Sequence, residues 1–518
     1  MTRKNLAVVL VLCLLLACFS ACQSEQDEIY SQAVEDQKSA VSAAPTAEPG
    51  DGEASEMLQG EDSLAGELTI RVGVLRDMYR INSLAMEFMK LHPGVTITID
   101  ADYSIAQWDN MSSAEQRMHQ ESFRSQLRIE IASGEADYLI FDFDEDLDLT
   151  PLTQVGALYD MREFWENDPD IREEDLFMSV IEAFQVDGKM TAIPYAFRFP
   201  TVTFSQHVID DVGIDLTGVH TVSVTQLLDW YDEARAHKPE LNLIFTSQSK
   251  ETLFFYERPD YIDLVTGTSS FDSTDFVEFL ERTVAVNAEE PDLRENDIGM
   301  GDTGFASYWE EYWETGKMSA YIQNISDQQI IDIVTKTREW FCIPENQIFK
   351  TSFTLQQPLA YQTQPYALIS TDGKLVIDSH EAFAVPSSLK NKELAWEFIK
   401  YCLNTREDPT FSQALGVSEL YTYGIPVNKE NYWKGAEHLS AGGTYTGYSL
   451  GYPANYPGLD PDATVEEMEA MLSVNTVYAG AYNVDVQEYL DEYYVNDLIS
   501  AEECAKKIQD RTYMWLNE

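Results

Sequence analysis

Apolar residues in the first part of the ordered chain switch between the spacing of strands and the spacing of helices. Residues 68–75 are rich in apolar side chains and predict a strand. The next apolar positions follow the i, i+3, i+4, i+7 spacing of one helix face and are Ile81, Leu84, Ala85 and Phe88. The sequence His92-Pro93-Gly94 predicts the end of this helix, because proline lacks the backbone N–H that a helix interior needs.

The same switching continues along the next segments. Val95, Ile97 and Ile99 alternate with polar residues and predict a second strand. A second helix ends at Gly134 and has an apolar face made of Phe123, Leu127 and Ile131. Residues 138–141 then form a short buried run. This order of strand, helix, strand, helix, strand requires an α/β fold with a parallel sheet, and ligands of such sheets bind beyond the carboxyl ends of the strands.

The acidic composition excludes a nucleic-acid partner. Of the 518 residues, 89 are Asp or Glu and 34 are Lys or Arg, which gives a formal net charge of −55. A body of this charge repels polyanions and anionic membrane surfaces. With 44% hydrophobic residues the chain is still apolar enough to fold, and its length predicts two or three domains or lobes.

The chain begins with the pattern of a bacterial lipoprotein signal peptide over residues 1–22. A short positive region precedes an apolar run at residues 6–16, which is too short to span a membrane. Residues 15–22 resemble a lipobox, in which a small residue precedes a cysteine that receives lipid. We expect the lipid on Cys22, because a polar stretch follows it at once, although Cys18 has the better residue three positions before it.

Residues 23–66 predict a disordered tether. They contain Ala, Ser, Gly and eleven acidic residues, against Lys38 as their basic residue. Such a segment repels itself and stays extended, so it would hold a folded body away from a lipid-anchored N-terminus.

Cysteine and metal patterns predict no cofactor. Beyond residue 22 the chain has Cys342, Cys402 and Cys504, an odd number of widely separated residues that suggests neither a disulfide framework nor a zinc site. Residues 142–148 carry four alternating aspartates and imitate a calcium loop. Leu147 stands where that loop requires glycine, so weak calcium binding stays only an alternative.

Enzyme motifs occur only in incomplete form. Residues 299–304 match G-x-G-x-x-G but follow a polar stretch where a dinucleotide site needs a strand, and the enclosed Asp302-Thr303-Gly304 lacks the second triplet of a pepsin-like site. His380-Glu381 is not followed by a second histidine at the metalloprotease spacing. A glycosidase carboxylate pair stays open, because the fold sets the separation of two carboxylates.

Several short segments together resemble the family 1 extracellular solute-binding proteins of bacterial ABC importers, the branch that includes maltose-binding protein. Their order and spacing cover nearly all of residues 67–518. The segments are 88–97, 132–138, 187–194, 315–320, 384–388 with the helix at 394–400, 424–429 and 500–505. Two stretches depart from the family pattern: residues 202–206, and an insertion-like stretch at 349–379.

The resemblance implies the type II periplasmic-binding-protein-like fold, in which two α/β lobes joined by a hinge close on a ligand cleft. We expect chain crossings at about residues 195–200, 378–383 and 416–426. The N-terminal lobe would then contain residues 67–195 and about 380–415. The C-terminal lobe would contain about 200–378 and 426–518.

The resemblance also implies that the loops after the strands contact the ligand. The expected ligand-binding residues are Arg76, Asp77, Tyr79, Asp142, Asp144, Tyr195, Arg198, Gln323 and Asn324. A structural or solvated role is the alternative for each of them. A second group comprises Trp108, Asp109 and the tyrosines of the Gly-rich segment 442–458. The aromatic residues Phe305, Trp309, Tyr312, Trp313, Trp396, Phe398 and Trp515 are expected to pack in cores.

Three function classes follow. The first is a lipid-anchored binding subunit on the extracellular face of the cell membrane, monomeric and not an enzyme, which delivers a solute, expected to be a sugar, to ABC permease subunits. The second is a secreted glycoside hydrolase. The third is a surface lipoprotein that binds a ligand for sensing or adhesion.

Overall fold

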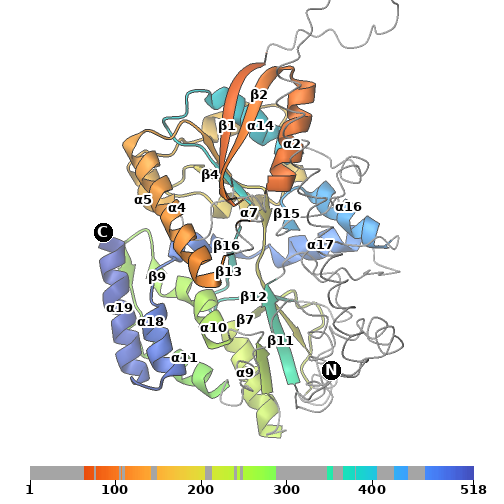
Figure 1. Ribbon diagram of the computed structural model, residues 1–518. Coiled ribbons are helices and arrows are strands. Elements are labelled where there is room, and N and C mark those ends of the chain that lie inside the picture. The colour runs from red at the N-terminus through yellow and green to blue at the C-terminus, as the bar shows by residue number, and fades with distance from the viewer. Residues whose placement is uncertain are drawn as a thin grey trace, which may run out of the picture. The chain divides into compact units, whose positions relative to one another are not determined.

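The computed structural model describes residues 64–74, 78–103, 107, 111–141, 149–204, 213–237, 242–245, 249–286, 347–353, 366–379, 381–404, 425–440 and 461–517 (Figure 1). They belong to a compact unit, Ser63–Glu518. The expected signal peptide, Cys18, Cys22 and nearly all of the expected tether lie outside the described residues. Within the described ranges, no helix combines the length and the apolar character needed to cross a membrane.

The first of two five-stranded sheets has the order β2-β1-β3-β14-β4 (Figure 1). Its strands are β1 (Ala65–Val74), β2 (Gly94–Tyr103), β3 (Leu139–Phe141), β4 (Ala192–Pro194) and β14 (Ala382–Ala384). The first three run parallel, and β14 runs antiparallel between β3 and β4. The helices α2 (Met78–Leu91) and α4 (Ser113–Ser133) connect the parallel strands, so the predicted strand–helix order is confirmed.

Strand β1 begins three residues earlier than its apolar pattern predicts. The backbone of Ala65 and Gly66 already pairs with Gly94 and Val95 of β2, and such pairing needs no apolar side chain. The last two residues assigned to the tether therefore belong to the sheet.

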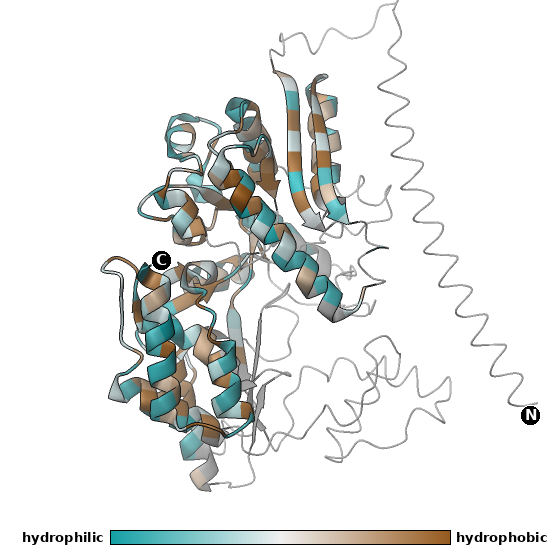
Figure 2. Ribbon diagram, turned by 60° about the vertical axis from the view of Figure 1, so that its left-hand side comes forward, coloured by the Kyte–Doolittle hydropathy of each residue, from teal (hydrophilic) through white to brown (hydrophobic). Residues whose placement is uncertain are grey.

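Helices cover both faces of the first sheet. The predicted face of α2 is buried, and Phe88 meets Phe398 of α14 (Lys392–Asn404) at a ring distance of 5.4 Å. On the other face α4 packs closely, because Gly73 leaves room for the ring of Phe123. Gly134 ends α4 in the left-handed conformation (φ 75°), as predicted. Figure 2 shows hydrophobic and hydrophilic residues alternating along the two long strands that these helices cover.

The second sheet has the order β7-β12-β6-β11-β8. Its strands are β6 (Pro200–Phe204), β7 (Thr221–Ser223), β8 (Asn242–Phe245), β11 (Gln347–Phe353) and β12 (Tyr366–Ile369). Strand β11 pairs with both β6 and β8. The stretch 349–379 was expected to be an insertion, but its residues 349–353 and 366–369 are strands inside this sheet. Their place in the sheet depends on backbone pairing with distant strands and not on local pattern.

An aromatic cluster forms much of the core of the second sheet and its helices. These helices are α9 (Val224–His237), α10 (Ser249–Glu257), α11 (Thr274–Val286), α18 (Gln487–Leu490) with the π-helical η8 (Asp491–Val495), and α19 (Ala501–Asn517). The rings of Phe254, Phe271 and Phe276 lie 4.9–6.0 Å apart. Trp515 packs against this core, and Trp396 and Phe398 are buried beside the first sheet, as predicted. Phe305, Trp309, Tyr312 and Trp313 lie outside the described residues.

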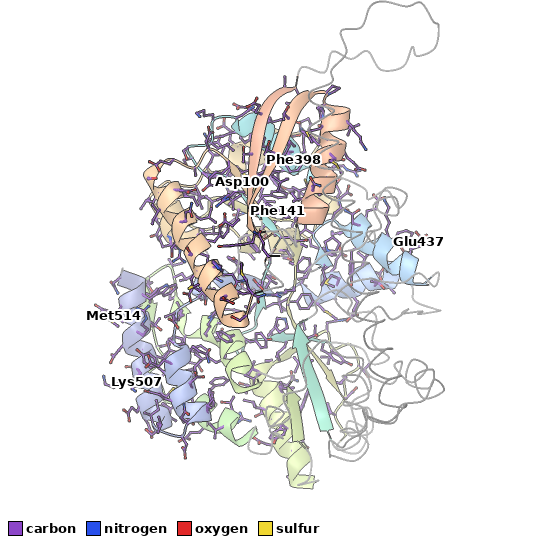
Figure 3. The ribbon with its side chains drawn as sticks, in the orientation of Figure 1. Asp100, Phe141, Phe398, Glu437, Lys507 and Met514 are labelled. Atoms are coloured by element: carbon purple, nitrogen blue, oxygen red, sulfur yellow. The ribbon has the colours of Figure 1, made fainter. Side chains whose placement is uncertain are left out.

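Shorter elements complete the described part of the chain. The helical ones are α5 (Leu149–Gln154), α6 (Arg162–Asn167), η2 (Glu173–Asp175), α7 (Met178–Ala183), η3 (Arg258–Asp260), α16 (Lys429–Ser440), α17 (Pro461–Met471) and η7 (Ala479–Tyr482). The strands are β5 (Ala196–Phe197), β9 (Ile262–Asp263), β10 (Thr268–Ser269), β13 (Lys374–Ile377), β15 (Ile425–Pro426) and β16 (Asn475–Tyr478). Figure 3 contrasts the interior rings of Phe141 and Phe398 with the outward Glu437, Lys507 and Met514.

Candidate functional site

Two chain segments run between the two sheets and pair with each other, and the short strand β15 (Ile425–Pro426) pairs with one of them. Ala192–Pro194 pair antiparallel with Ala382–Ala384, and Arg198 pairs with Asp378 in the same register. On the other side, β15 pairs antiparallel with β5, and the N–H of Val427 donates to the carbonyl of Tyr195 (3.0 Å). We call this three-stranded connection the crossing ribbon. It includes residues from each of the expected crossings, and their role as a hinge between lobes stays a prediction.

An ion pair fixes the end of the crossing ribbon that leads into the second sheet. The Arg198 guanidinium donates from Nε to Oδ2 of Asp378 (2.6 Å), and its Nη2 contacts the same oxygen. The other carboxylate oxygen accepts the N–H of Ser379 (2.7 Å), whose hydroxyl donates to the carbonyl of Ala196 (2.5 Å). Arg198 is thus engaged in holding two crossings together, and its expected contact with a ligand stays a prediction.

Tyr195 lies in the middle of the crossing ribbon. Its side chain is buried, at 2% exposure, with its ring 6.3 Å from that of Phe383. Its N–H donates to the carbonyl of Glu381 (2.7 Å). A ligand contact of Tyr195 likewise stays a prediction.

The other expected ligand-binding residues fall largely outside the described residues. These are Arg76, Asp77, Asp142, Asp144, Gln323 and Asn324, together with the second-rank Trp108, Asp109 and segment 442–458. Tyr79 belongs to the first turn of α2. At the carboxyl edge of the first sheet, the described residues are the last residues of β1, β2 and β3, which are Val74, Tyr103 and Phe141.

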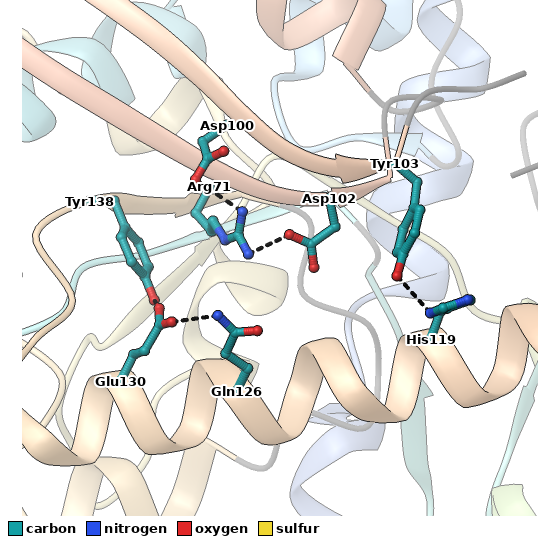
Figure 4. A network of polar contacts seen from close by, with 8 residues as sticks. All are labelled: Arg71, Asp100, Asp102, Tyr103, His119, Gln126, Glu130 and Tyr138. Atoms are coloured by element: carbon teal, nitrogen blue, oxygen red, sulfur yellow. Dashed lines mark hydrogen bonds and ion pairs between the residues drawn. The ribbon is translucent and has the colours of Figure 1, made fainter. Parts of the chain in front are cut away.

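Two residues at this edge were not among those expected from the sequence. The hydroxyl of Tyr103, the last residue of β2, lies 2.6 Å from Nδ1 of His119 on α4 (Figure 4). Their ring centroids are 4.6 Å apart at an angle of 52°. Both side chains are partly exposed. Only the tyrosine's position at the end of the alternating run could have indicated this pair, because His119 belongs to a different element.

An arginine holds β1 and β2 together beneath α4. Arg71 is 8% exposed and donates to Asp100 (2.9 Å) and Asp102 (2.5 Å), which share one face of β2 (Figure 4). The guanidinium also lies 5.3 Å from the ring centroid of Phe123. With two carboxylates and an aromatic ring around it, Arg71 serves to fix α4 over the sheet.

A second tyrosine contact ties the far end of α4 to the sheet. The hydroxyl of Tyr138, just before β3, donates to Glu130 (2.6 Å), which also accepts from Gln126 (2.7 Å). Burial, and then the carboxylate of Glu130, raise the pKa of Tyr138. Burial works to raise the pKa of Glu130, but the hydrogen bonds from Tyr138 and Gln126 hold it below its ordinary value.

Glu257 is the described carboxylate whose protonation is most altered. Burial raises its pKa to about 7, and the negative charges of Asp260 and Asp372 act in the same direction, against the hydrogen bonding from Thr371. A raised carboxyl pKa is also a feature of the general acids of glycosidases. Glu257, however, is 2% exposed and its Oε2 accepts the backbone N–H of Thr371 (3.0 Å), so it holds a turn and is closed to a substrate.

The described ranges were expected from the sequence to hold neither a metal site nor a disulfide. Within them, no group of three or more His, Cys, Asp or Glu residues has a geometry that could hold a metal ion. Cys402 and Cys504 are buried and are not in a disulfide, and burial raises the pKa of Cys504 to about 12. Cys342 and the calcium-like segment 142–148 lie outside these ranges.

The comparisons with known proteins concern the fold. No protein-family model and no curated protein matches the chain. Among solved structures, 542 chains match. One is a designed esterase improved by directed evolution and rational design, which is 13% identical, with 88% of this chain and 99% of that chain covered and a TM-score of 0.51. The chain has a two-lobe α/β fold. The antiparallel return of β14 between β3 and β4 gives it the type II strand order that the resemblance implies.

Solute-binding proteins are also among the matching structures. A family 1 extracellular solute-binding protein from Alicyclobacillus acidocaldarius subsp. acidocaldarius DSM 446 is 15% identical, with 88% of this chain and 99% of that chain covered and a TM-score of 0.49. The ABC substrate-binding protein Lmo0181 from Listeria monocytogenes, in complex with cycloalternan, is 12% identical, with 87% and 99% covered and a TM-score of 0.47. At these identities the likeness extends to the fold alone.

Proposed function

We propose that this chain is the solute-binding subunit of an ABC importer, and that it binds a carbohydrate and delivers it to permease subunits. The observation that carries the proposal is the crossing ribbon. Short antiparallel segments, hydrogen-bonded side by side, are the described connection between two separate five-stranded sheets. Such a connection lets two bodies rotate about a narrow axis.

The expected lobe boundaries follow from the same reasoning. In the proposal, residues 67–195 and about 380–415 form one lobe, and about 200–378 and 426–518 form the other. A solute drives closure only when it binds the closed form more tightly than the open form, so it must touch both lobes. Arg76, Asp77, Tyr79, Asp142 and Asp144 would supply the contacts of the first lobe. Gln323 and Asn324 would supply those of the second.

Four carboxylates with defined structural partners favour binding without conversion. Asp100 and Asp102 pair with Arg71, Asp378 pairs with Arg198, and Glu257 is buried against a backbone amide. Each of these groups is engaged in holding the fold together. A subunit that must release its ligand intact gains nothing from a carboxylate poised for proton transfer. A secreted glycoside hydrolase is the alternative that turnover of the ligand would establish.

The expected location completes the proposal. A lipid on Cys22 would anchor the chain at the extracellular face of the membrane, and residues 23 to about 64 would act as the tether. The strongly negative charge argues against nucleic acid as a partner, and we expect the body to be a monomer.

A thermal-shift screen tests the proposal. The panel contains maltotriose, cellotriose, xylotriose, trigalacturonate, a tripeptide mixture, spermidine and calcium chloride. We expect one of the sugars to raise the unfolding temperature, small-angle scattering to show a smaller radius with that sugar, and chromatography to recover the sugar unchanged. A response to peptide, spermidine or calcium alone would contradict a carbohydrate ligand. Turnover abolished by a carboxylate substitution would establish the hydrolase instead.

A further inference from the structure

Helix α4 is joined to the first sheet by two tyrosine hydrogen bonds near its opposite ends. Tyr103 bonds to His119 near the start of the helix, and Tyr138 bonds to Glu130 near its end, each at 2.6 Å (Figure 4). Both tyrosines are partly exposed. The two hydrogen bonds have the same length and join the same helix to the sheet, so Tyr138 serves as a structural control for Tyr103.

The two tyrosines lie at different levels along the strands of the sheet. Tyr103 is the last residue of β2, whereas Tyr138 immediately precedes the first residue of β3. Strands β1, β2 and β3 run parallel, and Tyr103 pairs with Val74 at the carboxyl edge, whereas Tyr138 precedes Leu139, which pairs with Ile70 in the middle of β1. In open α/β sheets, ligands bind beyond the carboxyl edge. Of the two, Tyr103 alone occupies that position.

The chemistry of the Tyr103–His119 pair suits a sugar. A flat aromatic ring covers the apolar face of a pyranose, while hydroxyl and imidazole groups can hydrogen-bond to its hydroxyls. The bond to Nδ1 and the tilted contact between the rings limit the rotation of the tyrosine. A side chain held in place in this way loses little further freedom when a ligand binds.

The geometry points to Tyr103, positioned by His119, as an aromatic contact for the sugar at the carboxyl edge of the first sheet. This inference rests on the proposed function and adds to it residues from β2 and α4. The first-ranked contacts expected from the sequence came from the loops after β1 and β3, the second lobe and the crossings, and the second group placed Trp108 and Asp109 after β2. Tyr103 would add the end of the strand that neighbours β1.

The test compares matched variants of the two tyrosines. The probe is the panel sugar that gives the largest thermal shift with the wild-type protein, and calorimetry measures its Kd. We expect Tyr103→Ala to raise Kd roughly tenfold or more, because a well-packed aromatic anchor is lost, and Tyr103→Phe to raise it only about twofold to fivefold. Tyr138→Ala should lower the unfolding temperature by a similar amount to Tyr103→Ala and leave Kd within about twofold of wild type.

A second variant protects the test against misfolding. Tyr103→Leu keeps apolar volume without a flat face, and should weaken binding nearly as much as Tyr103→Ala. Sugar binding by Tyr103→Leu or Tyr103→Ala within about twofold of wild type would overturn the inference and leave the proposed function standing. Equal losses from Tyr138→Ala and Tyr103→Ala would also overturn it, since they would show an effect through helix stability. Absence of sugar binding by the wild-type protein would overturn the proposed function and the inference together.

Discussion

Replacing Glu257 with glutamine should change how the stability of the fold depends on pH. Glu257 ends α10 and accepts a hydrogen bond from the Thr371 amide in the turn between β12 and β13. The negative charges of Asp260 and Asp372 also raise the pKa of Glu257, and Lys374 pairs with Asp260 (3.1 Å). A glutamine can keep the bond from Thr371 through its amide oxygen, and it carries no charge at any pH.

The expected magnitude follows from the pKa of Glu257. Its ordinary value of 4.5 applies to the unfolded chain, and the value in the folded protein is about 7. The folded state therefore holds the Glu257 proton more tightly than the unfolded chain does. The stability that this protonated side chain gives to the folded state is fully present below pH 4.5 and is lost as the pH rises toward 7. At about 1.4 kcal/mol for each pKa unit, ionising Glu257 costs the folded state about 3 kcal/mol above that pH.

Urea denaturation of both proteins between pH 4.5 and 8.5 measures the effect. The free energies of unfolding of wild type and Glu257→Gln should nearly coincide at the acid end and differ by about 3 kcal/mol, in favour of glutamine, above pH 7. Other titrating groups contribute to both proteins and cancel in the difference. Glu182→Gln, at an exposed helical position, serves as the control and should show no such trend. A difference that stays constant across this pH range would refute the reasoning.

Further predictions concern the crossing ribbon, a helix end and the N-terminus. Arg198→Ala and Asp378→Ala should each lower the free energy of unfolding by about 3 kcal/mol. The double variant should lose less of this free energy than the sum of the two single losses, and additive losses would contradict a direct pair. Gly134→Ala should cost about 1 kcal/mol in urea denaturation, because alanine disfavours the left-handed conformation, and an unchanged midpoint would count against this. Mass spectrometry of the membrane fraction should find a diacylglyceryl-modified peptide that begins at Cys22, and a modified Cys18 would show that this placement is wrong.

Local pattern was enough to predict the elements at the start of the body. The apolar faces of α2 and α4 and the stop at Gly134 follow from side-chain spacing and backbone preference, which depend on residues a few positions apart. The order of short segments also indicated the two-lobe fold. These features needed no knowledge of which distant residues meet.

The partners of the individual polar side chains were decided by the tertiary structure. Arg198 was expected to contact a ligand, but its partner Asp378 is 180 positions away and meets it only because two crossings pair in register. Tyr103 finds His119 through the packing of α4 on the sheet, and Glu257 owes its pKa to burial and to a turn more than a hundred residues later. Local spacing predicted the first strands and helices, whereas backbone pairing with distant segments decided strands such as β11 and β12. Burial and long-range charge are likewise properties of the folded arrangement, so the fold also decided what the polar groups do.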